Sequence, residues 1–268
     1  MHSSYLRHMI CNLFAMKTTL LFALLGLLAL PLQSFAQDEE EKPLIPQEDY
    51  DELLMWMVDG KYEKVLFKAI RYTEDDKTSK EPLPYAFMSE AFFRISQSDD
   101  AELVEEYDGA LKDALKYASK FRKKDRDNEH FADYVAYFNE LRRATMNEAE
   151  VFVDDEKFTR AKSYYKYLYV IDEGDAGAWI MYGTVLWKTK ARRDAEESWA
   201  TAKNLLTEFG GKGLEDVQRD LLHYAVRYTS EMLADEGDRA GAMEWLNLVA
   251  EIFPDDRELN AIRRSIGG

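Results

Sequence analysis

Cysteine is almost absent from this chain of 268 residues, because Cys11 is the only one. Cys11 precedes an apolar run from Leu20 to Leu30, so a chain cleaved after that run contains no thiol. Such a mature chain forms no disulfide and has no cysteine nucleophile or thiolate metal site. Its stability then depends on an apolar core, and the 232 residues after Ala36 are enough to bury roughly 70% of their unfolded surface.

Histidine and basic charge are also scarce. Beyond the leader, His130 and His223 are the only histidines, and neither has the i+4 partner of a helical zinc site. The net charge is −16 and becomes −18 when Arg7 and Lys17 leave with the leader. Because nucleic acids and anionic membranes bind through Lys and Arg, we expect neither as a partner. Basic protein partners fit this charge, and so does acidity that only maintains solubility.

Recognisable catalytic motifs are missing as well. The sequence has no paired-histidine zinc motif, nucleophile elbow, dinucleotide loop or complete calcium loop. The run 210–213, Gly-Gly-Lys-Gly, lacks the first glycine and the Ser/Thr of a phosphate loop, so we interpret it as a helix stop. Adjacent carboxylates such as Glu105 and Glu106 point in different directions on a helix and form no dyad. We therefore expect a non-enzymatic protein without a cofactor or metal, and an enzyme that uses carboxylates is the third alternative.

Residues 1–36 have the pattern of a secretory signal peptide. A start at Met16 followed by Lys17 supplies the charged region, an apolar run follows, and 34–36, Ser-Phe-Ala, predicts cleavage after Ala36. The apolar run is shorter than the roughly 20 residues that span a bilayer, so we expect no stable membrane insertion after the leader is removed. This predicts a periplasmic or secreted protein. Residues 37–47, which are acidic and contain two prolines, predict a disordered linker.

The rest of the chain, residues 48–268, predicts an all-α domain. Apolar residues recur three and four positions apart, strand-type alternation is scarce, and the whole chain contains only six prolines. About eleven helices are expected, including one long helix over 129–153. Turns are predicted at 59–60, Asp-Gly, and at 236–238, Glu-Gly-Asp.

One segment carries a specific repeat pattern. It reads Trp179-x-x-Tyr182-Gly183-x-x-Leu186, then Ala195-x-x-x-Trp199-x-x-Ala202. At this spacing Gly183 leaves room for a second helix to cross closely, and Ala195 enters that space. The pattern resembles a tetratricopeptide repeat of the exported bacterial type. The small-residue position recurs at Ser89, Ala149 and Ser230, and the aligned second-helix alanines are Ala114, Ala161, Ala195 and Ala242, which are 47, 34 and 47 residues apart.

The resemblance implies a right-handed superhelix of stacked antiparallel helix pairs, with about five irregular pairs and a capping helix over 258–266. It also implies a scaffold for protein–protein contacts, with a groove lined by the first helix of each pair. Together with the leader and the lack of cysteine, this predicts a scaffold in the periplasm of a Gram-negative bacterium. Phe93 and Trp187 are expected to face this groove. The predicted partner-binding residues are Phe93, Arg94, Met146, Glu150, Ile180, Thr184, Trp187, Lys188 and Arg227. The alternative is a periplasmic protein that binds a small ligand or glycan on groove aromatics.

Overall fold

The computed structural model describes residues 44–267, which contain helices and no strand. The predicted leader, 1–36, and residues 37–43 of the predicted linker lie outside the described residues. Ile45 is buried, with 1% of its surface exposed, and the first helix begins at Gln47. The last residues of the predicted linker therefore belong to the fold. None of the described helices is long and apolar enough to cross a membrane.

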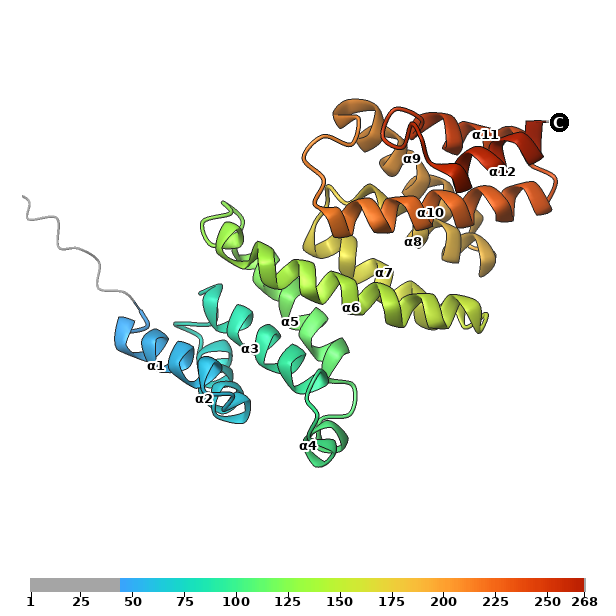
Figure 1. The fold of residues 1–268 in the computed structure, drawn as a ribbon. Coiled ribbons are helices and arrows are strands. Elements are labelled where there is room, and N and C mark those ends of the chain that lie inside the picture. Colours follow the sequence, from blue (N-terminus) through green and yellow to red (C-terminus); the bar gives the residue numbers. More distant parts are fainter. Residues whose placement is uncertain (1–43, 268) are drawn as a thin grey trace, which may run out of the picture. The chain divides into compact units, whose positions relative to one another are not determined.

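This part of the chain forms twelve α-helices and one short 3-10 helix, η1 (Figure 1). In chain order the elements are α1 (Gln47–Val58), α2 (Tyr62–Glu74), α3 (Leu83–Ser96), α4 (Ala101–Glu106), α5 (Ala110–Lys124), η1 (Phe131–Tyr134), α6 (Val135–Asp154), α7 (Phe158–Ile171), α8 (Ala176–Lys188), α9 (Arg192–Phe209), α10 (Asp216–Asp235), α11 (Arg239–Leu248) and α12 (Arg257–Gly267). The predicted all-α class is confirmed.

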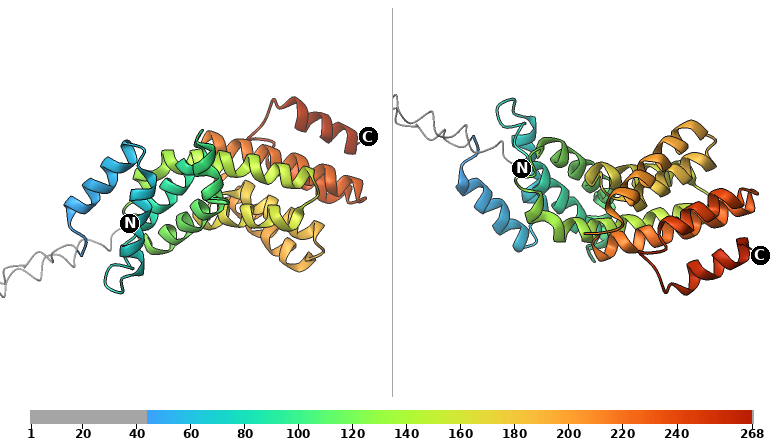
Figure 2. Two further views of the ribbon diagram at one scale, coloured as in Figure 1. Left: turned by 90° about the horizontal axis from the view of Figure 1, so that it is seen from below. Right: turned by 90° about the horizontal axis from the view of Figure 1, so that it is seen from above.

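The helices pack mainly against their neighbours in the chain. Five pairs form from α1 with α2, α3 with α5, α6 with α7, α8 with α9, and α10 with α11. Successive pairs meet through α2 and α3, α5 and α7, α7 and α8, and α8 and α10, and α12 packs against α10 and α11. Figure 2 shows this succession from two further directions. Each pair therefore buries its apolar stripes against the next pair.

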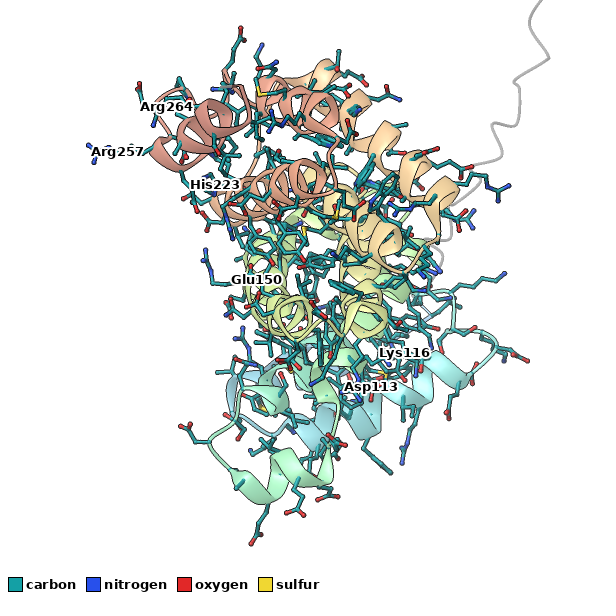
Figure 3. All side chains as sticks on the ribbon, turned by 90° about the vertical axis from the view of Figure 1, so that its right-hand side faces the viewer. Asp113, Lys116, Glu150, His223, Arg257 and Arg264 are labelled. Carbon is teal, nitrogen blue, oxygen red and sulfur yellow. The ribbon has the colours of Figure 1, made fainter. Side chains whose placement is uncertain are left out.

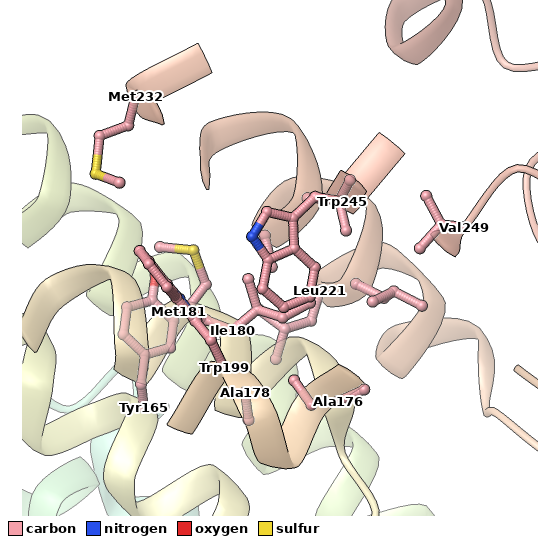
Figure 4. Packing of buried hydrophobic residues seen from close by; sticks show 14 of the residues in the cluster. Tyr165, Ala176, Ala178, Ile180, Met181, Trp199, Leu221, Met232, Trp245 and Val249 are labelled. Atoms are coloured by element: carbon pink, nitrogen blue, oxygen red, sulfur yellow. The ribbon is translucent and has the colours of Figure 1, made fainter. Parts of the chain in front are cut away.

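Three apolar clusters make up the core. The first contains residues from α1 through α5, and the second contains residues from α3, α5, α6 and α7. The third contains residues from α6 through α12. Figure 4 shows part of the third cluster, where Tyr165, Trp199, Leu221 and Trp245 come together from four different helices. The core therefore lies between successive helix pairs.

Gly183 allows α8 and α9 to cross closely. A Cβ atom at this position would lie 2.4 Å from Cδ1 of Trp199 and 3.0 Å from the carbonyl oxygen of Ala195. Real Cβ atoms do not approach so closely, so any larger residue displaces α9. The close crossing predicted at Gly183 is confirmed.

Serine takes the equivalent position in two other pairs. Ser89 Oγ donates a hydrogen bond to the Ala114 carbonyl oxygen at 2.7 Å and shares another with the Tyr137 hydroxyl at 2.5 Å. Ser230 Oγ donates to the Ala242 carbonyl oxygen at 3.3 Å. Both serines are fully buried. A hydroxyl in this position therefore ties the first helix to the backbone of the second helix.

The prediction of one continuous helix over 129–153 is wrong. A 3-10 turn, Phe131–Tyr134, precedes α6, which begins at Val135. The Phe131 ring stacks on Phe138 with centroids 5.2 Å apart, and the Arg122 guanidinium lies 3.9 Å from the centroid of the Phe131 ring. These contacts accompany a tighter turn than α-helical geometry provides.

The segment between α3 and α5 contains a short helix of its own, α4. Asp100 begins it, because Asp100 Oδ1 accepts hydrogen bonds from the backbone N–H groups of Glu102 and Leu103 at 3.0 and 3.2 Å. This N-cap supplies partners for two free donors of the first turn. The described residues therefore form twelve α-helices, one more than the predicted number of about eleven.

Candidate partner-binding surface

Ion pairs connect α3, α6 and α10, which are the first helices of three of the pairs, to one another and to the closing helix α12. We call the surface that carries them the first-helix face and define it by the pairs Arg94–Glu140 (2.5 Å), Arg143–Asp220 (3.4 Å) and Arg227–Glu258 (3.4 Å). These pairs join α3 to α6, α6 to α10, and α10 to α12. In Figure 3, Glu150 of α6 and His223 of α10 lie toward the left of the view, whereas Asp113 and Lys116 of α5 lie toward the right.

Two predicted binding residues, Arg94 and Arg227, belong to this face. Arg94 also contacts Glu90 at 3.1 Å, and Arg227 contacts Glu231 at 3.3 Å. About a third of each arginine side chain is exposed, 32% and 28% respectively. Both guanidinium groups are therefore accessible, but carboxylates of this chain already hold them.

Four predicted binding residues are core residues, namely Phe93, Met146, Ile180 and Thr184, with 3%, 7%, 0% and 0% exposed. Phe93 packs edge-on against Tyr137 of α6, with ring centroids 5.8 Å apart. Thr184 Oγ1 shares a hydrogen bond with Thr229 Oγ1 of α10 at 2.7 Å. The prediction that Phe93 faces a groove is wrong, because the next first helix covers it. These side chains hold neighbouring pairs together.

Trp187 is partly exposed, but its own chain surrounds it. The indole N–H donates to a Glu236 carboxylate oxygen at 2.8 Å, and the Arg192 guanidinium lies 3.5 Å from the ring centroid. The Trp199 ring is 5.0 Å away. Lys188 is exposed, and its ammonium lies 5.4 Å from the Phe158 ring. The structure thus keeps Trp187 and Phe93 apart and leaves neither ring as a free stacking surface.

Glu150 differs from the other charged residues of the first-helix face. It is half-buried on α6 and makes no ion pair or side-chain hydrogen bond with the described residues. Burial raises the pKa of its carboxyl group, the neighbouring Asp154 raises that pKa further, and Arg227 opposes both effects. Glu150 is therefore a carboxylate that the fold leaves without a direct partner.

A buried polar network lies beside this face and was not predicted from the sequence. Arg142, 5% exposed, donates from Nε to Asp175 at 2.9 Å and from Nη2 to Asp172 at 3.0 Å. Gln218 of α10 donates to the same Asp172 oxygen at 2.8 Å. Burial raises the pKa of Asp175, and Arg142 opposes that effect. The network joins α6, the loop after α7, and α10.

Two sequence signals could have indicated part of this network. Asp175 directly precedes an apolar helix, and its Oδ1 accepts a hydrogen bond from the Ala178 N–H at 3.0 Å, as an N-cap does. The inward position of Arg142 on α6 was a second signal. Neither signal identifies the pairing, because the two residues are 33 positions apart in the chain.

A pocket of about 310 Å³ borders the network. This is at the lower limit of the sizes typical of small-ligand pockets. Its polar lining includes Arg142, Asp172 and Gln218. Its apolar lining includes Phe131, Val135, Phe138, Ala176, Leu205, Leu206, Phe209 and Leu214. The pocket thus combines apolar walls with a few convergent polar groups.

No group of three or more His, Cys, Asp or Glu side chains that could hold a metal ion occurs within residues 44–267. Neither a scan against protein-family models nor a search of curated proteins finds a match for this chain.

Proposed function

We propose that this chain is a non-enzymatic, exported scaffold that binds a protein or peptide partner through its first-helix face. In this proposal the helix pairs form a right-handed, tetratricopeptide-like superhelix. The observation that carries it is the recurring close contact between a small residue of a first helix and an alanine of the second, as at Gly183 and Ala195 or Ser89 and Ala114. The signal pattern that ends at Ala36 supports export.

The first-helix face has properties suited to a partner. Its ion pairs are partly solvent-exposed, so each contributes little to stability, roughly 0–1 kcal/mol. The Arg143 and Asp220 side chains, for example, are 59% and 58% exposed. A partner can therefore exchange such pairs for contacts of its own at low cost. Charges arranged in this way also orient an incoming partner.

Affinity capture tests the proposal. The purified protein, its Arg143→Glu variant and its Arg193→Glu variant are each used to capture proteins from a cell-envelope extract. Arg143 lies on the first-helix face, whereas Arg193 belongs to the second helix α9 and is 85% exposed, so Arg193→Glu is the matched charge control. We expect a partner that the parent and the control retain and that Arg143→Glu loses.

Two outcomes contradict the proposal in different ways. Equal capture by all three proteins means that the partner does not bind the first-helix face. If the parent retains no specific protein at any salt concentration, the scaffold function itself fails. Circular dichroism of each variant establishes that the helices are intact.

The pocket beside Arg142 favours a second candidate, the binding of a small ligand with both polar and apolar parts. A thermal-shift screen of small metabolites tests it. Phe209 lines the pocket and is 51% exposed, whereas Phe67 on α2 is 65% exposed and is absent from its lining. A true pocket ligand raises the unfolding temperature of the parent and of Phe67→Ser but not of Phe209→Ser. A ligand that stabilises all three equally binds elsewhere.

A further inference from the structure

Basic side chains gather on α5, although the chain as a whole is strongly acidic, with a net charge of −16. We call this group the α5 basic row and define it as Lys112, Lys116, Lys120 and Lys124, which recur every four residues. The first three are exposed, and Lys124 is partly exposed. Residues four positions apart are neighbours on a helix surface, so these lysines form one continuous row along α5.

The fold leaves most of this row without a counter-charge. Asp113 is the only acidic residue of α5, and it contacts Lys116 at 3.7 Å in an exposed pair. Lys112, Lys120 and Lys124 form no ion pair within residues 44–267. Like charges four positions apart repel each other and weaken a helix. The stability of α5 therefore does not account for the row.

The helix dipole favours only one end of the row. Lys124 is in the last turn of α5, where a cation interacts favourably with the C-terminal end of the helix. Lys112 is in the first turn, where the same dipole disfavours a cation. The row thus begins against the local field of its own helix, and an external anion would offset this cost.

Two tyrosine rings lie against the middle of the row. The Lys120 ammonium is 4.8 Å from the Tyr117 ring centroid and 5.9 Å from that of Tyr85. The Lys116 ammonium lies 5.4 Å from the Tyr117 centroid. Burial lowers the pKa of Lys120, and the neighbouring cations Lys116 and Lys124 lower it further. The rings hold the ammonium groups side by side, so an anion between them relieves their mutual repulsion.

The neighbouring second helix extends this positive surface. α7 packs against α5 and contains Arg160, Lys162 and Lys166 but no acidic residue. Arg160 and Lys166 are exposed. Figure 3 shows Lys116 toward the right of the view and His223 of the first helix α10 toward the left. The row therefore belongs to the second helices and is distinct from the first-helix face.

Spacing and charge together indicate the kind of partner. Lysines four positions apart are separated by about 6 Å along the helix axis. Alternate residues of an extended chain lie on the same side, about 6.6–6.8 Å apart. An extended segment with a carboxylate at every second position can therefore place one carboxylate near each lysine. A broad anionic surface such as a membrane also meets the acidic remainder of this protein, whereas charges more than about 10 Å from a narrow segment are largely screened.

We propose that the α5 basic row is a docking surface for an extended acidic segment of a protein partner. The inference goes beyond the proposed function, because it assigns a second contact, on second helices, that does not depend on the first-helix face. Each carboxylate of the segment pairs with one lysine of the row. Hydrogen bonds between such charged groups are stronger than those between neutral groups, and several of them act together along α5.

A fluorescein-labelled peptide with glutamate at every second position and glycine between is the probe, and fluorescence anisotropy with the full chain is the measurement. The matched double variants are Lys116→Gln/Lys120→Gln on α5 and Arg257→Gln/Arg264→Gln on α12, and each removes two positive charges from exposed side chains. In Figure 3 the two arginines lie toward the left of the view, away from Lys116. We expect the affinity to fall at least about tenfold in the α5 variant and to change less than about twofold in the α12 variant.

Thermal unfolding of both double variants provides the folding control. Lys116→Gln/Lys120→Gln removes a repulsion between like charges on one helix, so its unfolding temperature should not fall below that of the parent. A clearly lower unfolding temperature contradicts the proposal, because the fold itself would then use these two charges.

Two further peptides test the charge and the spacing. A peptide with glutamine in place of glutamate is expected to lose binding to the parent, because it has no carboxylates. A peptide of the same composition with its glutamates in one uninterrupted run is expected to bind at least about threefold more weakly, because only every second carboxylate of an extended run faces the row. Equal affinity for the alternating and the uninterrupted peptide overturns the extended register.

Other results overturn the docking surface itself. Equal affinity of the two double variants means that the overall charge, and not the row, determines binding. Tighter binding of the parent to phosphatidylglycerol vesicles than to the glutamate peptide means that the row suits a broad anionic surface instead. Absence of any binding of the glutamate peptide by the parent overturns the proposal as well.

The outcome is separable from that of the proposed function. Arg143→Glu leaves α5 intact and is expected to bind the glutamate peptide within about twofold of the parent. A captured protein that Lys116→Gln/Lys120→Gln retains and Arg143→Glu loses supports the first-helix face whatever the peptide does. Row-dependent binding of the glutamate peptide without any captured protein supports the row and contradicts the scaffold.

Discussion

Single residues decide how closely the helices of this chain approach each other. At Gly183 the Trp199 ring and the Ala195 carbonyl occupy the space that a side chain would need. At Arg142 one guanidinium neutralises two carboxylates, and the Asp175 carboxylate is fully buried. The first is a steric requirement and the second an electrostatic one, so they predict different consequences of substitution.

Gly183→Ala is expected to destabilise the protein by about 1–3 kcal/mol, because overpacking forces the Trp199 ring and α9 to shift. Denaturant unfolding followed by circular dichroism measures the change. Gly267→Ala is the control, since a Cβ at that position meets no atom within 4 Å, and its effect is expected to stay within about 0.5 kcal/mol. Equal stability of the two variants would mean that α8 and α9 are not in close contact in solution.

Arg142→Met is expected to cost about 3–5 kcal/mol at neutral pH, because it leaves Asp175 buried without a counter-charge. Arg143→Met, an exposed neighbour on the same helix, is the control and is expected to cost at most about 1 kcal/mol. Unfolding experiments on both variants and the parent provide the comparison.

The pH dependence of Arg142→Met has a defined sign. Burial already raises the pKa of Asp175 in the folded parent, and loss of Arg142 raises it further. A raised pKa lets the folded state bind a proton that the unfolded state has lost, so stability from this group is present at low pH and declines as the pH rises. The deficit of Arg142→Met relative to the parent should therefore shrink as the pH falls from about 7 toward about 4. A constant deficit would show that Asp175 does not carry the effect.

At the level of elements, α12 closes one end of the stack. Its inward residues Leu259 and Ile266 are 2% and 8% exposed, and Ile262 between them packs against the same cluster. Arg263 donates to the carbonyl oxygen of Leu246 at 2.6 Å, which joins α12 to α11. The outward residues, including Arg264, are exposed. Such a polar outer surface is what a terminal helix of a stack requires.

Leu259→Ala is expected to destabilise the protein by about 2–3 kcal/mol, in the lower part of the range for buried leucines because a terminal helix can relax. Arg264→Ala on the same helix should change stability by less than about 0.5 kcal/mol. Thermal unfolding of both variants tests this. A neutral Leu259→Ala would indicate that α12 is detached from α10 and α11 in solution.

Helix pairing was largely predictable from the sequence, whereas side-chain surroundings were not. Gly60 and Gly237 end their turns with φ of 71° and 91°, values that favour glycine, so these turns could be recognised in advance. Periodicity also predicted that residues such as Ala195 face inward. It could not predict that Tyr137 covers Phe93 or that Arg142 pairs with Asp175, because both contacts join residues more than 30 positions apart.

At the level of the whole described unit, residues 44–267, the two ends differ. The closing helix α12 is polar on its outer side, but α1 exposes Leu54, Met55 and Val58, with 57%, 51% and 81% of their surface accessible. Leu53 is the single buried residue of α1, and this helix packs mainly against α2. In a linear stack stability is a sum of local terms, so the α1 end should open first.

Hydrogen exchange measures this difference directly. Amides of α1 are expected to exchange through local opening at a lower free energy than those of α8, which has nine buried residues. Leu53→Ala should accelerate exchange in α1 and α2 while leaving α8 unchanged. If all helices exchange with one common free energy, the unit unfolds in a single cooperative step and the linear model is wrong.

The tryptophans make these two ends optically distinguishable. Trp199 lies 5.0 Å from Trp187 and 6.3 Å from Trp245, whereas Trp56 belongs to a different apolar cluster beside Lys68, whose ammonium is 5.6 Å from its ring. Excitation passes readily among indoles at such short separations, so Trp187, Trp199 and Trp245 should emit as one coupled group. Trp179, also on α8, stacks on Tyr169 with ring centroids 3.8 Å apart. Trp56 reports separately on α1. The colour and decay time of the emission can therefore show which end of the protein has come apart.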